Sequence, residues 1–292
     1  MPDARSTLLF ALVLAALAFC GLWFVQLRER RAEHSDERLF PGPIALGIGF
    51  ISDFFDTLGI SSFATSTAMF RSAKVVPDRQ LPGTLNVGHT LPTVLQALIY
   101  IVLIEVDFLT LTTMIGASML GAALGANAVA RLSERGVRLG MGLALVLAAA
   151  LIVARQQGLL PGGSDALALR GAWLAAGLLG NFVLGALMTL GIGLYAPCMI
   201  LVSLLGMNPK AAFPIMMGSC AFLMPVASRA FLKQAAYQPR AALGLAIGGL
   251  PAVWIAANIV KELELATMRW LVLAVVLYTG VSLLLAARRP SS

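Results

Sequence analysis

Long apolar runs separated by short charged turns occupy almost the whole chain and decide what it can fold into. The first covers 7–27, and the others cover about 41–72, 82–104, 108–130, 139–157, 171–206, 211–228, 241–260 and 268–287. About 20 apolar residues are enough for one helix to cross a bilayer. Only 12% of the residues are charged, far fewer than in an ordinary globular domain. The sequence therefore predicts an all-α integral membrane protein with about 9–11 membrane segments.

The remaining charges are mostly basic and give a net charge of +7. They sit in short turns between apolar runs, where they report membrane topology, and no nucleic-acid motif accompanies them. Cys20, Cys198 and Cys220 lie inside apolar runs without metal-ligand spacing, so we expect no metal and no cofactor. The first run is nearer a full span than a signal-peptide core. Residues 1–40 are therefore interpreted as an uncleaved helix and a cytoplasmic loop.

Two runs, 41–72 and 171–206, are too long for a single crossing and are interrupted by glycine, proline or aspartate. We first let each run cross twice, or fold as a hairpin that returns to its own side, with the N-terminus outside. The inside turns then carry more than twice as many Lys and Arg residues as the outside turns. If each run crosses the membrane only once, the Lys and Arg residues are divided almost evenly between the inside and the outside turns. The positive-inside rule favours the first arrangement, with the N-terminus in the periplasm and the C-terminus in the cytoplasm.

The two interrupted runs also resemble each other. The first contains GIGFISDFFDTLGISSFATSTAMF and the second contains GIGLYAPCMILVSLLGM, and each leads into a charged turn bounded by two prolines at the same interval. In the favoured topology one turn faces the cytoplasm and the other faces outside. We therefore expect one transmembrane domain over 1–292, with two inverted-topology repeats, about 41–137 and about 171–267, that contain broken helices or hairpins. Such repeats are typical of secondary transporters.

Three motifs carry a resemblance to a known family: ISDFFDTLGISSFATST, VPDRQLPGTLNVGHTLPT and GIGLYAPCMILVSLLGMNPKAAFP. They resemble the TauE/SafE family of sulfite exporters and related organic-anion permeases, over most of residues 41–230. Ser61 stands where members with a DTLGIGSF pattern have glycine. The resemblance implies export of sulfite or a sulfur-containing organic anion across the bacterial inner membrane by a protein that is not an enzyme. It does not fix the substrate.

Ionisable side chains inside membrane spans are costly and are therefore candidates for function. Only Asp53, Asp56 and His89 qualify in this sequence. The two aspartates lie three residues apart, on one face if the segment is helical. Three roles stay open for them: binding a coupling proton or cation, capping a half-helix that starts near 57–62, or pairing with His89. An imidazole can gain or lose a proton near neutral pH.

No Lys or Arg lies in the middle of a span, so an anion must be held by backbone N–H groups, hydroxyls and helix N-termini, whose dipoles favour negative charge. The candidate substrate-binding residues are those with such groups near the interruptions. They are Thr57, Gly59, Ser61, Ser62, Asn86, Gly88, His89, Thr90, Tyr195, Cys198, Gly218 and Ser219.

Two other functions compete with anion export. One is a proton- or sodium-coupled carrier of another small solute, with the aspartates as cation ligands. The other is an intramembrane enzyme with an aspartate dyad, which requires the two carboxylates on facing helices, whereas Asp53 and Asp56 are neighbours on one segment. The expected partners are a small anion and the lipid bilayer, without nucleic acid. The sequence leaves a homodimer open.

Overall fold

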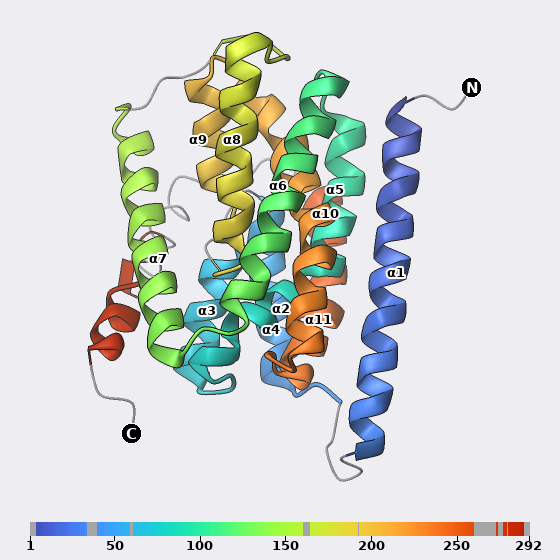
Figure 1. Ribbon diagram of the computed structural model, residues 1–292, viewed down its shortest axis with the longest axis vertical. Helices are drawn as coiled ribbons and strands as arrows, with labels where there is room; N and C mark the ends of the chain where they lie inside the picture. Colours follow the sequence, from blue (N-terminus) through green and yellow to red (C-terminus); the bar gives the residue numbers. More distant parts are fainter. Residues whose placement is uncertain are drawn as a thin grey trace.

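The structure is a computed structural model that describes residues 4–33, 40–58, 61–159, 164–191, 193–259, 273, 277–278 and 280–288. These residues form a bundle of helices and no strand (Figure 1). In chain order the elements are α1 (Ala4–Glu33), α2 (Pro43–Thr57), α3 (Ser62–Ala73), η1 (Asp78–Gln80), α4 (Leu81–Gly88), α5 (Thr90–Leu103), α6 (Phe108–Val129), α7 (Glu134–Gln156), α8 (Gly171–Met188), α9 (Tyr195–Leu204), η2 (Pro209–Ala211), α10 (Ala212–Lys233) and α11 (Pro239–Ile259).

Five of the described helices, α1, α6, α8, α10 and α11, are long and apolar enough to cross a membrane. The segment from η1 to α5 makes a sixth, bent by 40° between Gly88 and Thr90. Pro92 lies just after this bend and has no N–H to donate to the preceding turn. These spans confirm the predicted class, an all-α integral membrane protein. The number of 9–11 segments stays a prediction, because much of the predicted segment 268–287 lies outside the described residues.

Both long runs are broken. The first divides into α2 and α3 around 58–61, and the second into α8 and α9 around 189–194. In Figure 1 the α2–α3 hairpin begins and ends at the lower end of the bundle, and the α8–α9 hairpin at the upper end. With 12 and 10 residues, α3 and α9 are about 18 and 15 Å long, about half of a bilayer core. Each is therefore a half-helix that begins inside the bundle.

The two hairpins dock in matching ways. The most extensive helix contacts in the described chain join α2 to α11 and α8 to α6. A Cβ atom on Gly248 would collide with the backbone of α2 at Leu46, and one on Gly121 would collide with the backbone of α8 at Phe182. Gly244 with Gly248 on α11, and Gly121 with Gly125 on α6, are both spaced for close helix approach in membranes. Each hairpin thus packs its first helix on a glycine face in the other half of the chain.

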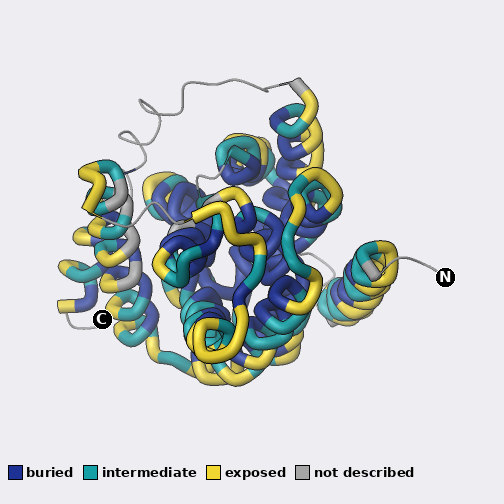
Figure 2. The backbone as a smooth tube through the Cα atoms, turned by 90° about the horizontal axis from the view of Figure 1, so that it is seen from above, coloured by how far each residue is buried: buried dark blue, intermediate teal, exposed yellow. Residues whose placement is uncertain are grey.

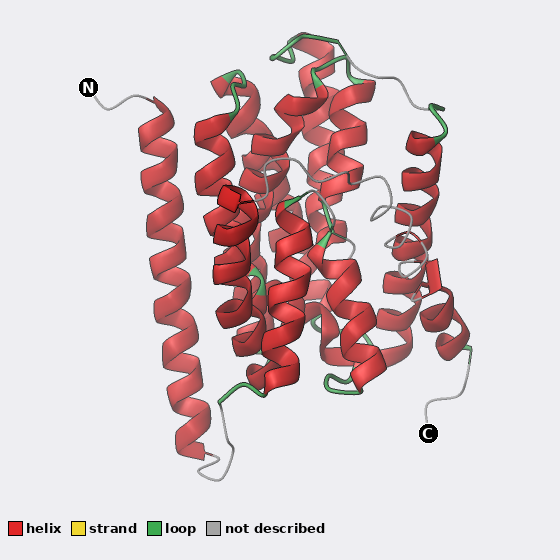
Figure 3. Cartoon of the chain, turned by 180° about the vertical axis from the view of Figure 1, so that it is seen from behind, coloured by secondary structure: helices red, strands yellow, loops and turns green. Residues whose placement is uncertain are grey.

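Helix α1 stands at the edge of the bundle, where it packs against α10 and α5 (Figures 1 and 3). Seen from above in Figure 2, buried residues fill the centre and exposed ones face outward. Many exposed side chains are large and apolar, such as Phe10, Leu17 and Phe24 on α1 and Leu120 and Leu124 on α6. An apolar exterior of this kind suits a protein surrounded by lipid.

Candidate functional site

The first polar cluster joins α2, α3 and the α4–α5 bend. His89 lies at the bend, with its Nδ1 atom 2.8 Å from Asp53 Oδ1 and its Nε2 atom 2.8 Å from Ser66 Oγ. The side chains of Asp53 and His89 are fully buried, and Ser66 is also fully buried. The geometry thus pairs Asp53 with His89, and a coupling role for Asp53 stays a prediction. A buried carboxylate needs such a partner.

Asp56 lies at the break between α2 and α3. Its Oδ1 atom accepts a 2.6 Å hydrogen bond from the backbone N–H of Ser62, the first residue of α3. Its Oδ2 atom accepts from Gln96 Nε2 on α5 at 3.0 Å. A carboxylate at a helix N-terminus satisfies an orphan N–H group and complements the helix dipole. Asp56 thus caps the half-helix α3 from the preceding helix.

Gln96 connects the break of the first hairpin to the break of the second. Its Nε2 atom donates to Asp56 and to Thr57 Oγ1, and its Oε1 atom accepts a 2.6 Å bond from the hydroxyl of Tyr195, the first residue of α9. Tyr100 on the same helix donates to the carbonyl of Thr57 at 2.7 Å. Helix α5 therefore carries a polar bridge between the two half-helix N-termini.

A cavity lies between the two breaks. The start of α3 contributes Ser61 and Ser62, and the start of α9 contributes Tyr195 with its preceding residue Leu194. Asp56, Phe63, Thr93, Met188, Gly193 and Cys220 complete the lining. The cavity volume is about 10 Å³, the space of about one water molecule. A ligand larger than a water molecule would therefore require the surrounding side chains to move.

The other predicted site residues that the structure describes do not line this cavity. Gly88 packs against α11, and Gly218 packs against Ile115 and Ile101, so both serve helix contacts. Thr90 Oγ1 donates to Asn86 O at 2.6 Å within the α4–α5 bend. Ser219 accepts from Asn181 Nδ2 at 2.9 Å. Cys198 is fully buried on α9, and Gly59 lies outside the described residues.

Sequence reasoning missed two amides that organise the interior, Gln96 and Asn181. Both are fully buried, and Asn181 on α8 donates to Met114 O on α6 at 2.7 Å. Each is a lone amide in an apolar run, which is a readable signal because a polar side chain in a bilayer needs a partner. Among the described residues no group of three or more His, Cys, Asp or Glu side chains could hold a metal ion.

The comparison with known families agrees with this architecture. A family model described as sulfite exporter TauE/SafE matches residues 1–152, which is just over half of the chain and includes the whole α2–α3 hairpin, the α4–α5 bend and α6. Searches of curated proteins and of solved structures gave no match. The matched segment contains Asp53, Asp56 and His89. The chain therefore belongs to the TauE/SafE sulfite exporter family.

Proposed function

We propose that this protein is a secondary transporter that exports sulfite, or a related small sulfur-containing or organic anion, across the bacterial inner membrane. The family supplies the substrate class. The observation that carries the proposal is the cavity at which the N-termini of α3 and α9 meet. Two helix N-termini at one cavity favour a negative ion there, although no Lys or Arg is among its lining residues. Half-helices that end at such a point are typical of secondary transporters.

The proposed transport cycle has to open this cavity and release Asp56. The carboxylate of Asp56 already occupies the N-terminus of α3 through Ser62, so a substrate anion at that place would meet a negative charge. Protonation of Asp56 would remove the repulsion and weaken its hold on the Ser62 N–H group. Proton uptake at Asp56 and anion binding would then favour each other. This link supports the alternative in which transport is coupled to protons.

An enzymatic function receives less support. Ser66, His89 and Asp53 follow the hydrogen-bond order of a hydrolase triad. However, Ser66 is fully buried and does not line the cavity between the breaks, so no substrate can reach its hydroxyl in this conformation. Asp53 and Asp56 both belong to α2 and do not face each other across two helices. A carrier of another small solute would use the same cavity and differ only in what it accepts.

Orientation is part of the proposal. Arg71, Arg131, Arg138 and Lys233 lie at the ends of α3, α6, α7 and α10 that share one side of the bundle with the C-terminus. The positive-inside rule places that side in the cytoplasm and the N-terminus in the periplasm. Single cysteines at position 135 and position 210, labelled with an impermeant thiol reagent from the periplasm, test this. We expect labelling at 210 and protection at 135, and the reverse pattern would contradict the orientation.

The transport proposal is tested by efflux from proteoliposomes loaded with sulfite. We expect a saturable initial rate above that of protein-free liposomes. The rate is then measured against pH for wild type, Asp53→Asn, Asp56→Asn and His89→Gln. If Asp56 carries a coupling proton, Asp56→Asn transports without pH dependence. If Asp56 only caps α3, Asn serves nearly as well because Asn and Asp cap comparably. A folded protein with no efflux of sulfite or of small sulfonates would contradict the proposal.

A further inference from the structure

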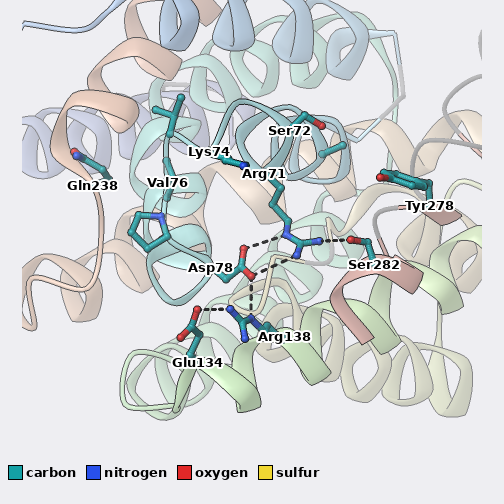
Figure 4. Close-up of a pocket in the computed structure, with 13 residues that line it drawn as sticks. Arg71, Ser72, Lys74, Val76, Asp78, Glu134, Arg138, Gln238, Tyr278 and Ser282 are labelled. Atoms are coloured by element: carbon teal, nitrogen blue, oxygen red, sulfur yellow. Dashed lines mark hydrogen bonds and ion pairs between the residues drawn. The ribbon is translucent and has the colours of Figure 1, made fainter. Parts of the chain in front are cut away.

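A second and much larger cavity lies at the end of the bundle that holds the C-terminus. Its volume is about 590 Å³, and its lining comes from α3, the turn after it, η1, α7, Gln238 and the C-terminal residues Tyr278 and Ser282. Figure 4 shows its polar side chains. The lining carries three cations, Arg71, Lys74 and Arg138, and two anions, Asp78 and Glu134. The pocket is thus polar and basic, and it is separate from the cavity between the hairpin breaks.

Two arginines from different helices converge on one carboxylate in this pocket. Asp78 Oδ1 accepts from Arg71 Nε at 3.0 Å, and Asp78 Oδ2 accepts from Arg138 Nε at 2.9 Å (Figure 4). Asp78 is only 12% exposed, and the arginines are 18% and 22% exposed. These contacts are therefore better shielded from solvent than an ordinary surface ion pair. The place that Asp78 occupies is an anion position built from α3 and α7.

The arginines keep donors for a further ligand. Each guanidinium has five N–H donors. Among the described residues, Arg71 directs these at Asp78 and Ser282, and Arg138 directs them at Asp78 and Glu134. The remaining N–H groups, together with Lys74, which also lines the pocket, match the several acceptor oxygens of a small oxyanion. Guanidinium groups suit tetrahedral oxyanions such as phosphate as well as they suit carboxylates.

We propose that this pocket binds a small oxyanion of the sulfite and sulfate class, with Asp78 as a built-in competitor for the same arginines. An arriving anion takes over donors from Asp78, and the released carboxylate turns toward water in the pocket. The pocket adjoins the end of the α2–α3 hairpin through Arg71, so it would gather substrate at the side where export begins. That choice of sulfite as ligand rests on the proposed function, whereas the site itself rests on the arginines.

The test measures binding of sulfite and inorganic sulfate to the purified full-length protein by equilibrium dialysis with radiolabelled anion. We expect saturable binding that Arg138→Gln and Arg71→Gln each weaken about tenfold or more, as expected for loss of a charge-assisted contact. The matched control is Arg135→Gln. Arg135 lies on the same helix, is exposed and does not line the pocket, so its loss should change affinity by less than about twofold. Equal weakening by all three changes, or weakening by none, overturns the proposal.

Asp78→Asn distinguishes an anion site from a structural ion-pair network. If Asp78 competes with the ligand, Asn should tighten binding by about threefold or more, because a nearby like charge is removed. A network with only a structural role predicts no tighter binding. Asp78→Asn also allows the proposal to be tested if an arginine variant fails to fold. Unchanged or weaker anion binding by folded Asp78→Asn protein contradicts the competition.

The same pocket chemistry would accept a lipid phosphate, so the assay is repeated in nanodiscs of phosphatidylcholine with and without phosphatidylglycerol. We expect the same sulfite affinity in both. If phosphatidylglycerol abolishes the sulfite binding that depends on Arg138, the lipid headgroup is the occupant. That result would overturn the proposal for a free anion. Binding without efflux would leave this site standing while the transport proposal fails, and efflux without binding here would do the reverse.

Discussion

The α2–α3 and α8–α9 hairpins share a construction and differ in chemistry. In both, the second helix is a short half-helix whose N-terminus lies at the cavity between the breaks. Both also dock their first helix on a glycine face in the other half of the chain. The first hairpin buries Asp53 and Asp56. Residues 171–204 contain no acidic or basic side chain. The architecture is thus common to both hairpins, while the ionisable chemistry belongs to one.

The two breaks are also stabilised by different means. At the first, the Asp56 side chain holds the start of α3 through Ser62. At the second, Gly191 and Gly193 adopt φ angles of 94° and 73°, a region that favours glycine, and α9 has no side-chain cap. The first break therefore depends on a titratable side chain, whereas the second depends on backbone conformation and on the Tyr195 hydroxyl. Substitutions should separate these two dependences.

The largest expected effect concerns the shared feature, the glycine faces. Gly121→Leu and Gly248→Leu should each prevent folding, because the new side chain meets the backbone of the partner helix, which cannot move aside. Overpacking of this kind costs about 3 kcal/mol or more. The measurement is the yield of monodisperse protein after detergent extraction and its melting temperature. If the two halves are built alike, both variants fail to a similar degree.

Gly116→Leu and Gly47→Leu are the matched controls for those variants. Gly116 lies on α6, as Gly121 does, and Gly47 lies on α2, the helix that Gly248 contacts. A Cβ atom at either control position would have no neighbouring atom within 4 Å. Both control proteins should fold, since leucine favours helix more than glycine does. Folded Gly121→Leu protein beside unfolded Gly248→Leu protein would show that the two docking interfaces are not equivalent.

The second prediction tests the chemical difference between the hairpins. Asp53→Ala removes the carboxylate partner of the buried His89, which keeps only its contact with Ser66, and should cost about 3 kcal/mol or more. Asn181→Ala, in the second hairpin, removes neutral hydrogen bonds to Met114 and Ser219 and should cost about 1–2 kcal/mol. Unfolding free energies of the detergent-solubilised variants provide the comparison. A larger loss for Asn181→Ala would contradict the assignment of the dominant buried polar contact to the first hairpin.

The third prediction concerns the bridge between the breaks. Tyr195→Phe removes the donor to Gln96 Oε1 and should destabilise the protein by about 1–2 kcal/mol, because a buried carbonyl is left unpaired. Since Gln96 also contacts Asp56, the effects of Tyr195→Phe and Asp56→Asn should not add. A double-mutant cycle measures this coupling, which should reach about 0.5 kcal/mol or more. Strict additivity would mean that Gln96 does not connect the two hairpins.

The sequence predicts where the helices begin and are interrupted, but not which side chains of different helices contact one another. The apolar runs and their interruptions follow from hydropathy and from glycine, proline and aspartate positions, and the observed helices follow these runs closely. The Asp53–His89 pair and the Asp56 cap were each among three open roles, because spacing along a chain does not show which helices meet. Gln96 and Tyr195 lie 99 positions apart. Gly88 and Gly218 are predicted to lie at the anion site and are found packed against other helices, because glycine in a membrane helix serves close packing as readily as ligand contact.

The smallest expected effect lies at the end of the bundle opposite the C-terminus, where the second hairpin is tied to the first half of the chain. Arg170, the residue before α8, forms two 2.8 Å hydrogen bonds with Asp107, which also caps α6 through the N–H of Thr110 at 2.9 Å. These contacts, the bond to Arg170 first, lower the pKa of the Asp107 carboxyl below its ordinary value of 3.8. Arg170 is largely exposed, so solvent screens the pair and its contribution is small.

A carboxyl whose folded-state pKa is depressed stabilises the protein above its ordinary pKa, and this stabilisation is lost only as the pH falls through the depressed value. The melting temperatures of wild type and Asp107→Asn should therefore differ by no more than about 3 °C. The difference should stay constant from about pH 5 to pH 8 and shrink below about pH 4. Asn can still cap α6, which isolates the charge. A difference that changes between pH 6 and pH 7 would mean that a group other than Asp107 controls it, and would contradict the prediction.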